Sequence, residues 1–343
     1  MTKFGLLLPL GGSATARSIA DRAVEAEAAG FDSAWVIEDY YSWEAFGSLG
    51  YVAAVTERVR LGISVTTPYV RSAPLLASSA ATLDQFSNGR LILGMGRSSG
   101  TMLGQIGIAD RKPFATMREY TEAMRLLWRG GEVSYDGKVV HIDRIVPDVL
   151  PVNGSVPVVI GAIGPQMLEL AGEIADGVVL TGFSPPPYVK WAVEHVAKGA
   201  ARAGRDPSEV EIIVMVATRI TDDVQTAIDE LKPWLGLAYG MTGRGEIFLT
   251  DSGIDASVLE PIRRALKIDE ILGEGLEPYL HSYKRVTPES VAAVVPDELV
   301  RAASIIGPPS EARLQLQAFL DAGATHVMVD SPQPAELLLD ALS

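Results

Sequence analysis

The residues that could do chemistry in this 343-residue chain gather in short polar segments, each of which follows an apolar run. The segments are rich in glycine, hydroxyl and aromatic side chains, and they read EDYYSW at 38–43, SVTTP at 64–68, GMGRSSG at 94–100, GAIGP at 161–165 and TGFS at 181–184. They hold no Ser/His/Asp set, and the adjacent carboxylates Glu38 and Asp39 would point to opposite faces of a strand. Such segments favour chemistry carried by a bound cofactor, to which the protein supplies shape and hydrogen bonds.

Two of the segments could bind an anion. In GAIGP a strand ends and a helix begins with Pro165 in its first turn, so free backbone N–H groups could hold a phosphate there. In GMGRSSG, Arg97 and two hydroxyls follow the end of a strand. Each signal is weak alone, because a glycine-rich turn between a strand and a helix is more often only a tight turn. The GxG at 94–96 is not a dinucleotide fingerprint, because no third glycine or downstream acid fits it.

Eight apolar strands, each paired with a helical pattern, would position these segments. The first four strands recur at roughly 28 to 30 residues, the length of one βα unit. The helical pattern that begins at Ala16 ends at Gly30, a typical C-cap. The strands are apolar on both faces, as in a parallel sheet covered by helices. We expect them at Phe4–Pro9, Ser33–Ile37, Arg60–Thr66, Arg90–Gly96, Val156–Gly161, Asp176–Gly182, Val210–Thr218 and Ala324–Asp330.

This repeat predicts an α/β fold, a closed (β/α)8 TIM barrel that forms a single domain over residues 1–343. A doubly wound open sheet is the alternative. Two insertions would interrupt the barrel, after strands 4 and 7: a hairpin within 130–156 that turns at Asp136–Gly137, and glycine-rich and helical pieces at about 233–303. Insertions after barrel strands lie at the C-terminal face, where barrel active sites sit, so the second is a candidate lid. A decoration that faces solvent or another subunit explains it equally well.

Composition argues against several classes of protein. Asp and Glu total 43 against 29 Lys and Arg, for a formal net charge of −14, and no basic stripe is visible, so we expect neither nucleic acid nor an anionic membrane as a partner. The chain has no cysteine, and its four histidines lie far apart, so we expect no metal site. The apolar start of the chain is broken by Pro9 and Gly11 and indicates a strand, not a signal peptide. No apolar run is long enough to span a membrane. We expect a cytoplasmic protein.

Beyond these patterns, the stretch LGISVTTPYVRSAPLLASSAATLDQFSNGRLILGMG at 61–96 resembles the third and fourth strands of the luciferase-like monooxygenases. It is most similar to their branch dependent on the deazaflavin coenzyme F420, which includes methylenetetrahydromethanopterin reductase and a glucose-6-phosphate dehydrogenase. Further matches are FDSAWVIEDYY at 31–41, IGAIGPQMLELAGEIADGVVLTG at 160–182 and IIGPPSEARLQLQAFLDAGATHVMV at 305–329. Together they cover most of the chain except the two insertions.

The resemblance implies a cofactor site for coenzyme F420 or, as the alternative, FMN. It implies a non-prolyl cis peptide at Ser64–Val65, whose bulge backs the central ring of the cofactor. Asp39 matches an aspartate that meets the polar edge of the ring. The other cofactor contacts implied by the match are Thr66, Thr181, a phosphate-binding set of Gly96, Arg97 and Ser98 after the fourth strand, and a second set of Ala162, Ile163, Gly164 and Pro165 after the fifth. The family usually dimerises through barrel helices, so we expect a homodimer.

Two departures from the family leave the proton donor and the substrate open. The sugar-phosphate dehydrogenases carry His where this chain has Tyr40. Both they and the pterin reductases carry an acid shortly after the GxG, where this chain has Ser98 and Ser99. Tyr40 is the best remaining proton donor by position, although an unperturbed tyrosine has a pKa of about 10. Trp43 could stack on a substrate or simply pack the mouth of the barrel. These two residues are the catalytic candidates.

The leading hypothesis is therefore an F420-dependent oxidoreductase that transfers a hydride to or from an unidentified small organic substrate, chiefly by positioning the two reacting carbons. The second is an FMN-dependent luciferase-like monooxygenase, and similarity to the pterin reductases around Pro68–Ile108 favours the first. A third is a relative that has kept the barrel and lost the chemistry, which the missing acid near Ser99 motivates. A fourth, a sugar-phosphate aldolase or isomerase, lacks its Lys or Glu base at a strand end.

Overall fold

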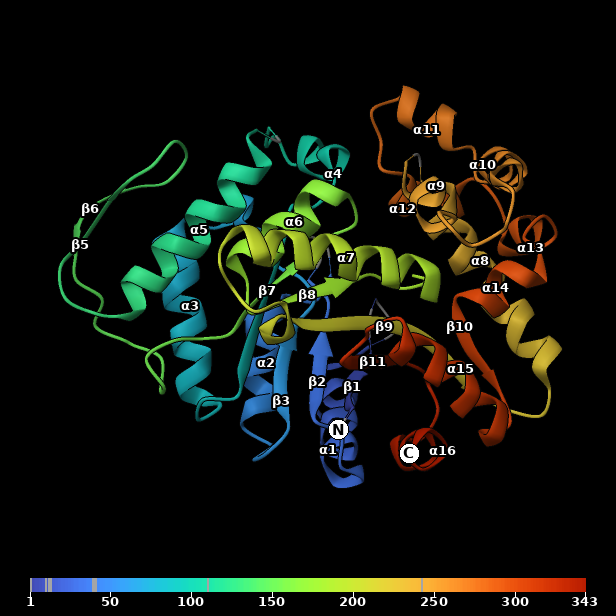
Figure 1. Cartoon of the computed structure of the whole chain (residues 1–343), viewed down its shortest axis with the longest axis horizontal. Coiled ribbons are helices and arrows are strands. Elements are labelled where there is room, and N and C mark those ends of the chain that lie inside the picture. Colours follow the sequence, from blue (N-terminus) through green and yellow to red (C-terminus); the bar gives the residue numbers. More distant parts are fainter. Residues whose placement is uncertain (1, 10, 12–13, 39–41, 110, 242) are drawn as a thin grey trace.

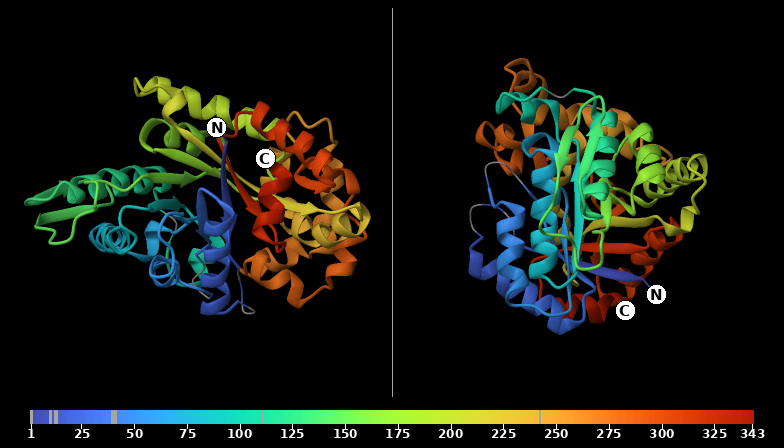
Figure 2. Two further views of the ribbon diagram at one scale, coloured as in Figure 1. Left: turned by 90° about the horizontal axis from the view of Figure 1, so that it is seen from below. Right: turned by 90° about the vertical axis from the view of Figure 1, so that its left-hand side faces the viewer.

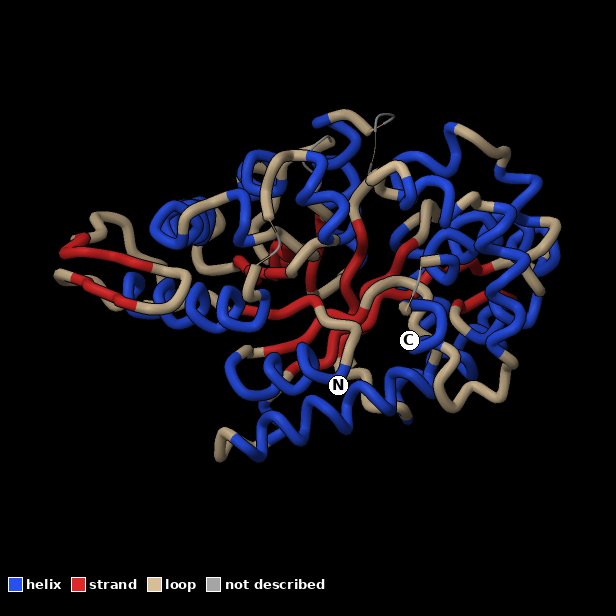
Figure 3. Tube along the Cα trace, turned by 90° about the horizontal axis from the view of Figure 1, so that it is seen from above, coloured by secondary structure: helices blue, strands red, loops and turns tan. Residues whose placement is uncertain are grey.

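The computed structural model describes residues 2–9, 11, 14–38, 42–109, 111–241 and 243–343. In this part of the chain eight parallel strands form a ring, which the pairing of β8 with β9 closes. The strands lie at the centre with helices around them (Figure 3). The closed barrel of the sequence analysis is confirmed and the open sheet is excluded. Its strands are β1 (Lys3–Leu7), β2 (Ser33–Val36), β3 (Arg60–Ile63), β4 (Leu91–Gly96), β7 (Val158–Gly161), β8 (Gly177–Leu180), β9 (Glu211–Ile220) and β11 (His326–Asp330).

Helices cover the outside of the barrel (Figure 1). The first begins at a capping box between Thr15 and Ser18 and ends at Gly30, whose φ of 98° is the left-handed conformation predicted for this C-cap. The second, whose bounds were not predicted, begins where the Glu44 side chain accepts hydrogen bonds from the Phe46 and Gly47 amides. The helices are α1 (Ala16–Ala29), α2 (Ala45–Ala53), α3 (Ala73–Phe86), α5 (Pro113–Trp128), α6 (Pro165–Ile174), α7 (Pro186–Arg202), α15 (Pro309–Asp321) and α16 (Ala335–Leu342).

Both predicted insertions are present, after the fourth and seventh barrel strands. The first holds the short helix α4 (Gly100–Gln105) and an antiparallel hairpin, β5 (Val133–Asp136) with β6 (His141–Ile145), which turns where predicted. The hairpin projects from one side of the barrel, and the helices of the second insertion lie on the other (Figure 2). Those helices are α8 (Val224–Gly240), α9 (Arg244–Phe248), α10 (Leu259–Ala265), α11 (Ile268–Gly273), α12 (Pro278–His281), α13 (Pro288–Ala292) and α14 (Asp297–Ala302).

One strand was missed. The ninth strand of the sheet, β10 (Ser304–Gly307), pairs in parallel with the far end of β9, from Ala217 to Ile220. Because it pairs there, β9 runs two residues beyond the predicted end at Thr218. The second insertion therefore returns to the sheet through β10 before α15 begins.

The interior of the barrel is closed near the N-terminal ends of the strands. Trp35 fills it, because Gly5 and Gly62 leave the room: a Cβ would lie 2.5 Å from Trp35 at Gly5 and 2.1 Å at Gly62. Trp35 Nε1 donates to Ser33 Oγ at 2.6 Å, and Ser33 bonds the buried His326. The next inward layer is apolar, with Leu7, Ile92, Val159, Val179, Ile213 and Met328 around Trp35. Any ligand site inside the barrel must therefore lie above this layer, at the C-terminal ends.

Candidate active site

Val65 lies at the C-terminal mouth of the barrel, just after β3 and against the ends of β4 and β7. The Ser64–Val65 peptide is cis, as the sequence comparison predicted. Past this bond the chain stays attached to β4: the Thr66 amide donates to Gly94 O at 2.9 Å, and the Gly96 amide donates to Thr66 O at 2.8 Å. Ser64 and Thr66 are buried, whereas Val65 is only partly so. The two hydrogen bonds therefore fix an apolar side chain at the mouth of the barrel.

Glycines on the neighbouring strands make room for Val65. A Cβ on Gly96 would lie 2.4 Å from Val65 Cγ2, and one on Gly161 would lie 3.3 Å from both Val65 methyl groups. At Gly94 a Cβ would lie 1.9 Å from Ile63 O, so no side chain fits there at all. The glycine-rich strand ends seen in the sequence are thus explained by close packing. We call Val65 together with Gly94, Gly96 and Gly161 the Val65 platform.

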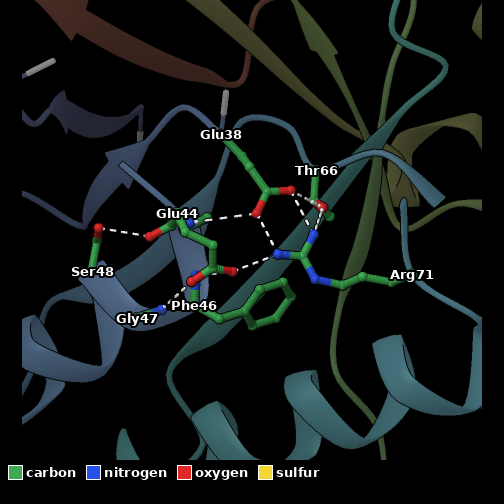
Figure 4. Close-up of polar contacts among 8 residues, drawn as sticks. Glu38, Glu44, Phe46, Gly47, Ser48, Thr66 and Arg71 are labelled. Carbon is green, nitrogen blue, oxygen red and sulfur yellow. Dashed lines mark hydrogen bonds and ion pairs between the residues drawn. The ribbon is translucent and has the colours of Figure 1, made fainter. Parts of the chain in front are cut away.

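A buried ion pair ties the end of β2 to the segment after β3 (Figure 4). Arg71 donates to both oxygens of Glu38, from Nη1 at 2.8 Å and from Nη2 at 2.7 Å. The side chain of Glu38 is 4% exposed, and it also accepts a short hydrogen bond from Thr66 Oγ1. Arg71 further bonds Glu44 Oε1 at 2.5 Å and lies over the Phe46 ring. Glu38 is therefore a positioning group for Thr66 and is not available for acid–base chemistry.

The charge of Arg71 is secured by its partners. Burial lowers the pKa of Arg71, but the hydrogen bonds and negative charges of Glu38 and Glu44 outweigh burial and raise the pKa. The fork of the guanidinium matches the carboxylate of Glu38 in a two-point contact. Arg71 thus holds Glu38 and Glu44, which lie on either side of the 39–41 segment in the sequence.

Two adjacent loops after β4 and β7 offer groups to an anion. Gly96 and Gly161 are partners in the parallel register, so the residues that follow them lie side by side. Arg97 is exposed there, and Ser98 has a φ of 66°. No side chain caps α6 at Gly164, so the amides of its first turn remain for solvent or a ligand. The structure thus brings Gly96, Arg97, Ser98, Ala162, Ile163, Gly164 and Pro165 to one side of the mouth.

Thr181 lies after β8 and contacts the second insertion. Arg244, the first residue of α9, donates from Nη2 to Thr181 Oγ1 at 2.9 Å. Its Nε is buried without a hydrogen-bond partner, and no carboxylate of the described residues pairs with it. Burial lowers the pKa of Arg244 despite nearby tyrosines, and the Phe248 ring lies 5.2 Å from its Cζ. A cation placed in this way would be stabilised by an anionic group of a ligand.

The second insertion also reaches the loop after β4. Ser99 caps α4 and donates a 2.5 Å hydrogen bond to Glu277 Oε2, which lies at the start of α12 and is 2% exposed. The helices of this insertion therefore border the mouth on the side of β4 and of β8. This contact supports the lid hypothesis over a decoration remote from the site.

Several predicted residues remain untested. Asp39 and Tyr40 lie outside the described residues. Trp43 precedes α2 and is 37% exposed. Arg71 and Arg244 were missed; their partners Glu38 and Thr181 stand 33 and 63 residues away, so no local pattern could reveal the contacts. Among the described residues, no group of three or more His, Cys, Asp or Glu side chains could hold a metal ion. Nor does any described helix have the length and apolar character needed to cross a bilayer.

Comparisons with known proteins agree with this geometry. The family model described as luciferase-like monooxygenase matches residues 2–326. The chain is 31% identical to 5,10-methylenetetrahydromethanopterin reductase of Methanolobus tindarius over 92% of this chain and 90% of that protein. It is 30% identical to the F420-dependent glucose-6-phosphate dehydrogenase of Nocardia farcinica, over 92% and 88% of the two chains. The solved structure of the coenzyme F420-dependent tetrahydromethanopterin reductase from Methanopyrus kandleri superposes with a TM-score of 0.83 at 29% identity, over 98% of this chain and 97% of that one.

Proposed function

Because the chain belongs to the luciferase-like monooxygenase family, we propose that it is a coenzyme F420-dependent oxidoreductase that transfers a hydride between the deazaflavin and a small organic substrate. The two relatives and the solved structure described above, each matched over most of its length, are named as F420-dependent or as pterin reductases. The observation that carries the proposal is the Val65 platform, an apolar surface at the barrel mouth that three glycines make possible.

The residues at the mouth fit such a cofactor. A flat ring needs an apolar surface to lie on, and partly exposed Val65 offers one. An anionic tail needs donors, and the uncapped start of α6, Arg97 and the unpartnered Nε of Arg244 offer them. The cofactor would supply the hydride chemistry, and the protein would bind, orient and exclude water.

We assign the binding roles as follows. Ser64, Val65 and Thr66 would support the ring, and Asp39 would meet its polar edge. The loops after β4 and β7 would hold the phosphate, through Gly96, Arg97, Ser98, Ala162, Ile163, Gly164 and Pro165. Thr181, held by Arg244, would contact the cofactor on the side of the second insertion. Tyr40 and Trp43 would face the substrate.

Titration of the purified protein with F420 and with FMN, followed by tryptophan fluorescence, tests the proposal. F420 is expected to quench the signal with saturation, and FMN is not. Tight binding of FMN without binding of F420 would favour the FMN-dependent monooxygenase instead. Binding of neither cofactor would favour a relative that has lost the chemistry.

We further propose that the whole chain, 1–343, folds as one unit and acts as a homodimer in the cytoplasm. The resemblance to a family that dimerises through barrel helices supports the dimer. Light scattering at several concentrations measures its mass, and a monomer at all of them would refute the dimer. Limited proteolysis tests the single unit, and fractionation of the source cells tests the location.

A further inference from the structure

Asp330 is the last residue of β11 and reaches the mouth of the barrel. Alternate residues of this strand face inward: His326 bonds Ser33 beneath, and Met328 belongs to the apolar layer around Trp35. Val327 and Val329 instead pack in the outer core against the helices. Asp330 still pairs in register with Ala217 of β9, so the pleat continues through it. Its side chain therefore faces inward, in the layer directly above Met328.

The carboxyl group of Asp330 is uncommitted. It accepts no hydrogen bond from the described residues, whereas its backbone oxygen accepts one from Arg219 Nη1 at 3.2 Å. Arg219, on β9, is itself engaged by Glu230 and by Thr218 O. On the side of α1, Arg22 is paired with Glu25 and donates to backbone oxygens of the loop after β11. Thus no cation makes a direct contact with this carboxyl group within the described part of the chain.

Other acids near the mouth differ in this respect. Glu38 is paired with Arg71, and Glu277 accepts a hydrogen bond from Ser99. Burial raises the pKa of Asp330, and the charge of Arg219 lowers it by less, so the net shift is upward. A raised pKa favours the protonated form, which can donate a proton. Asp330 thus offers a titratable carboxyl group on an inward-facing strand position, which the serines after β4 cannot supply.

We propose that Asp330 is the general acid–base residue of this enzyme and that its substrate is a carbonyl–alcohol couple. In the direction of reduction, the carbonyl carbon accepts the hydride with its electron pair from the reduced deazaflavin. The C=O π bond breaks, and the oxygen takes the proton of Asp330, which is left as a carboxylate and regains a proton from water. In the reverse direction the carboxylate accepts the hydroxyl proton as the hydride leaves. This inference rests on the proposed function.

The need for a proton separates this class of substrate from a cationic imine. A cationic C=N group becomes neutral when it accepts a hydride and requires no proton donor. A carbonyl group becomes an alkoxide unless a proton arrives with the hydride, so an uncommitted acid at the mouth is of use only for the carbonyl. An aldehyde or ketone is therefore the substrate that matches Asp330.

The first test uses the protein without cofactor. Because the pKa of Asp330 is raised in the folded state, the wild type loses stability as pH rises from the unfolded-state pKa of about 3.9 through the folded-state pKa, above which its stability levels off. Asp330→Asn has no such group, so its melting temperature should exceed that of the wild type by an amount that grows over this range. Asp340→Asn, at an exposed position on α16, is the matched control and should show no such trend. A constant difference for Asp330→Asn would overturn the inference. If this variant does not fold, Asp330→Ser takes its place.

The second test measures turnover with reduced F420 and a panel of acetone, cyclohexanone and benzaldehyde. Asp330→Asn should lower kcat for carbonyl reduction by about 10²- to 10⁴-fold and leave the Kd for F420 unchanged. Three results would overturn the inference. Asp330→Asn could turn over as fast as the wild type, Glu277→Gln could lose turnover in its place, or the wild type could reduce none of the three carbonyl compounds. Failure of F420 to bind the wild type would refute the proposed function, whereas the pH trend without cofactor would still report on Asp330. The two failures are therefore distinguishable.

Discussion

Replacement of Gly96 by alanine tests whether the Val65 platform is held by close packing. The new Cβ would lie 2.4 Å from Val65 Cγ2, more than an ångström inside an ordinary carbon–carbon contact of about 3.5–4.0 Å. The backbone cannot retreat easily, because the Gly96 amide bonds Thr66 O at 2.8 Å. Val65 must then move into the mouth. We expect Gly96→Ala to lower the free energy of unfolding by about 1–3 kcal/mol, the usual cost of overpacking.

Removal of the two Val65 methyl groups should relieve this clash. Val65→Ala alone is expected to cost about 1 kcal/mol, because Val65 is only partly buried and each buried methylene contributes about 0.8 kcal/mol. The double variant has no methyl group for the new Cβ to meet, so it should be about as stable as Val65→Ala. The double variant should therefore be more stable, by about 1–3 kcal/mol, than the sum of the two single changes predicts.

Urea denaturation of the four proteins, with fluorescence titration of F420 in parallel, measures both consequences. Gly96→Ala and Val65→Ala should each weaken F420 binding, because either change alters the platform. Gly50→Ala is the control: its Cβ would meet nothing within 4 Å in α2, so it should be neutral or stabilising by about 0.5–1 kcal/mol. Simple additivity of the two single changes, or a Gly96→Ala protein as stable as the wild type, would refute the packing account.

Three further substitutions test the charges. Arg71→Ala should lower the free energy of unfolding by about 3–5 kcal/mol, because it leaves the buried Glu38 unpaired; urea denaturation measures this, and a loss below about 1 kcal/mol would contradict it. Arg244→Met should raise the melting temperature of the protein without ligand, and added inorganic phosphate should stabilise the wild type more than this variant. Burial raises the pKa of Glu211, but hydrogen bonds from His326 and Lys3 outweigh it and lower the pKa to about 2. The stability gained from this lowered pKa, about 3 kcal/mol, is complete above the unfolded pKa of about 4.3 and is lost as pH falls towards 2. The stability difference between the wild type and Glu211→Gln should shrink over that window, and a constant difference would contradict the assignment.

The barrel could be predicted because its strands carry their own signal. Each is a short apolar run followed by polar residues, and the period of one βα unit fixes how many there are. The misses follow from weaker signals. The four residues of β10 come after an irregular insertion, and α2 contains two glycines. The stretch GLAYG at 236–240, one of the glycine-rich pieces of the second insertion, forms the last turn of α8. A Cβ on Gly236 would lie 2.7 Å from Val291, and one on Gly240 would lie 2.7 Å from Leu266. These glycines serve close helix packing, which a single sequence does not distinguish from a loop.

The parts of the site that could be predicted are those that the barrel strands place. Residues on or just after a barrel strand are placed by the pleat and the register, so Ser64, Gly96 and Gly164 could be assigned to one mouth from the sequence alone. The two arginines that organise the mouth come from a loop and from an insertion, and their partners are set by tertiary folding. Asp330 is also placed by a strand, because His326, Met328 and Asp330 alternate along a strand whose end at Asp330 was predicted. Its inward position could therefore have been deduced. Only the structure reveals that its carboxyl group has no hydrogen-bond partner among the described residues, and this makes the residue a candidate for catalysis.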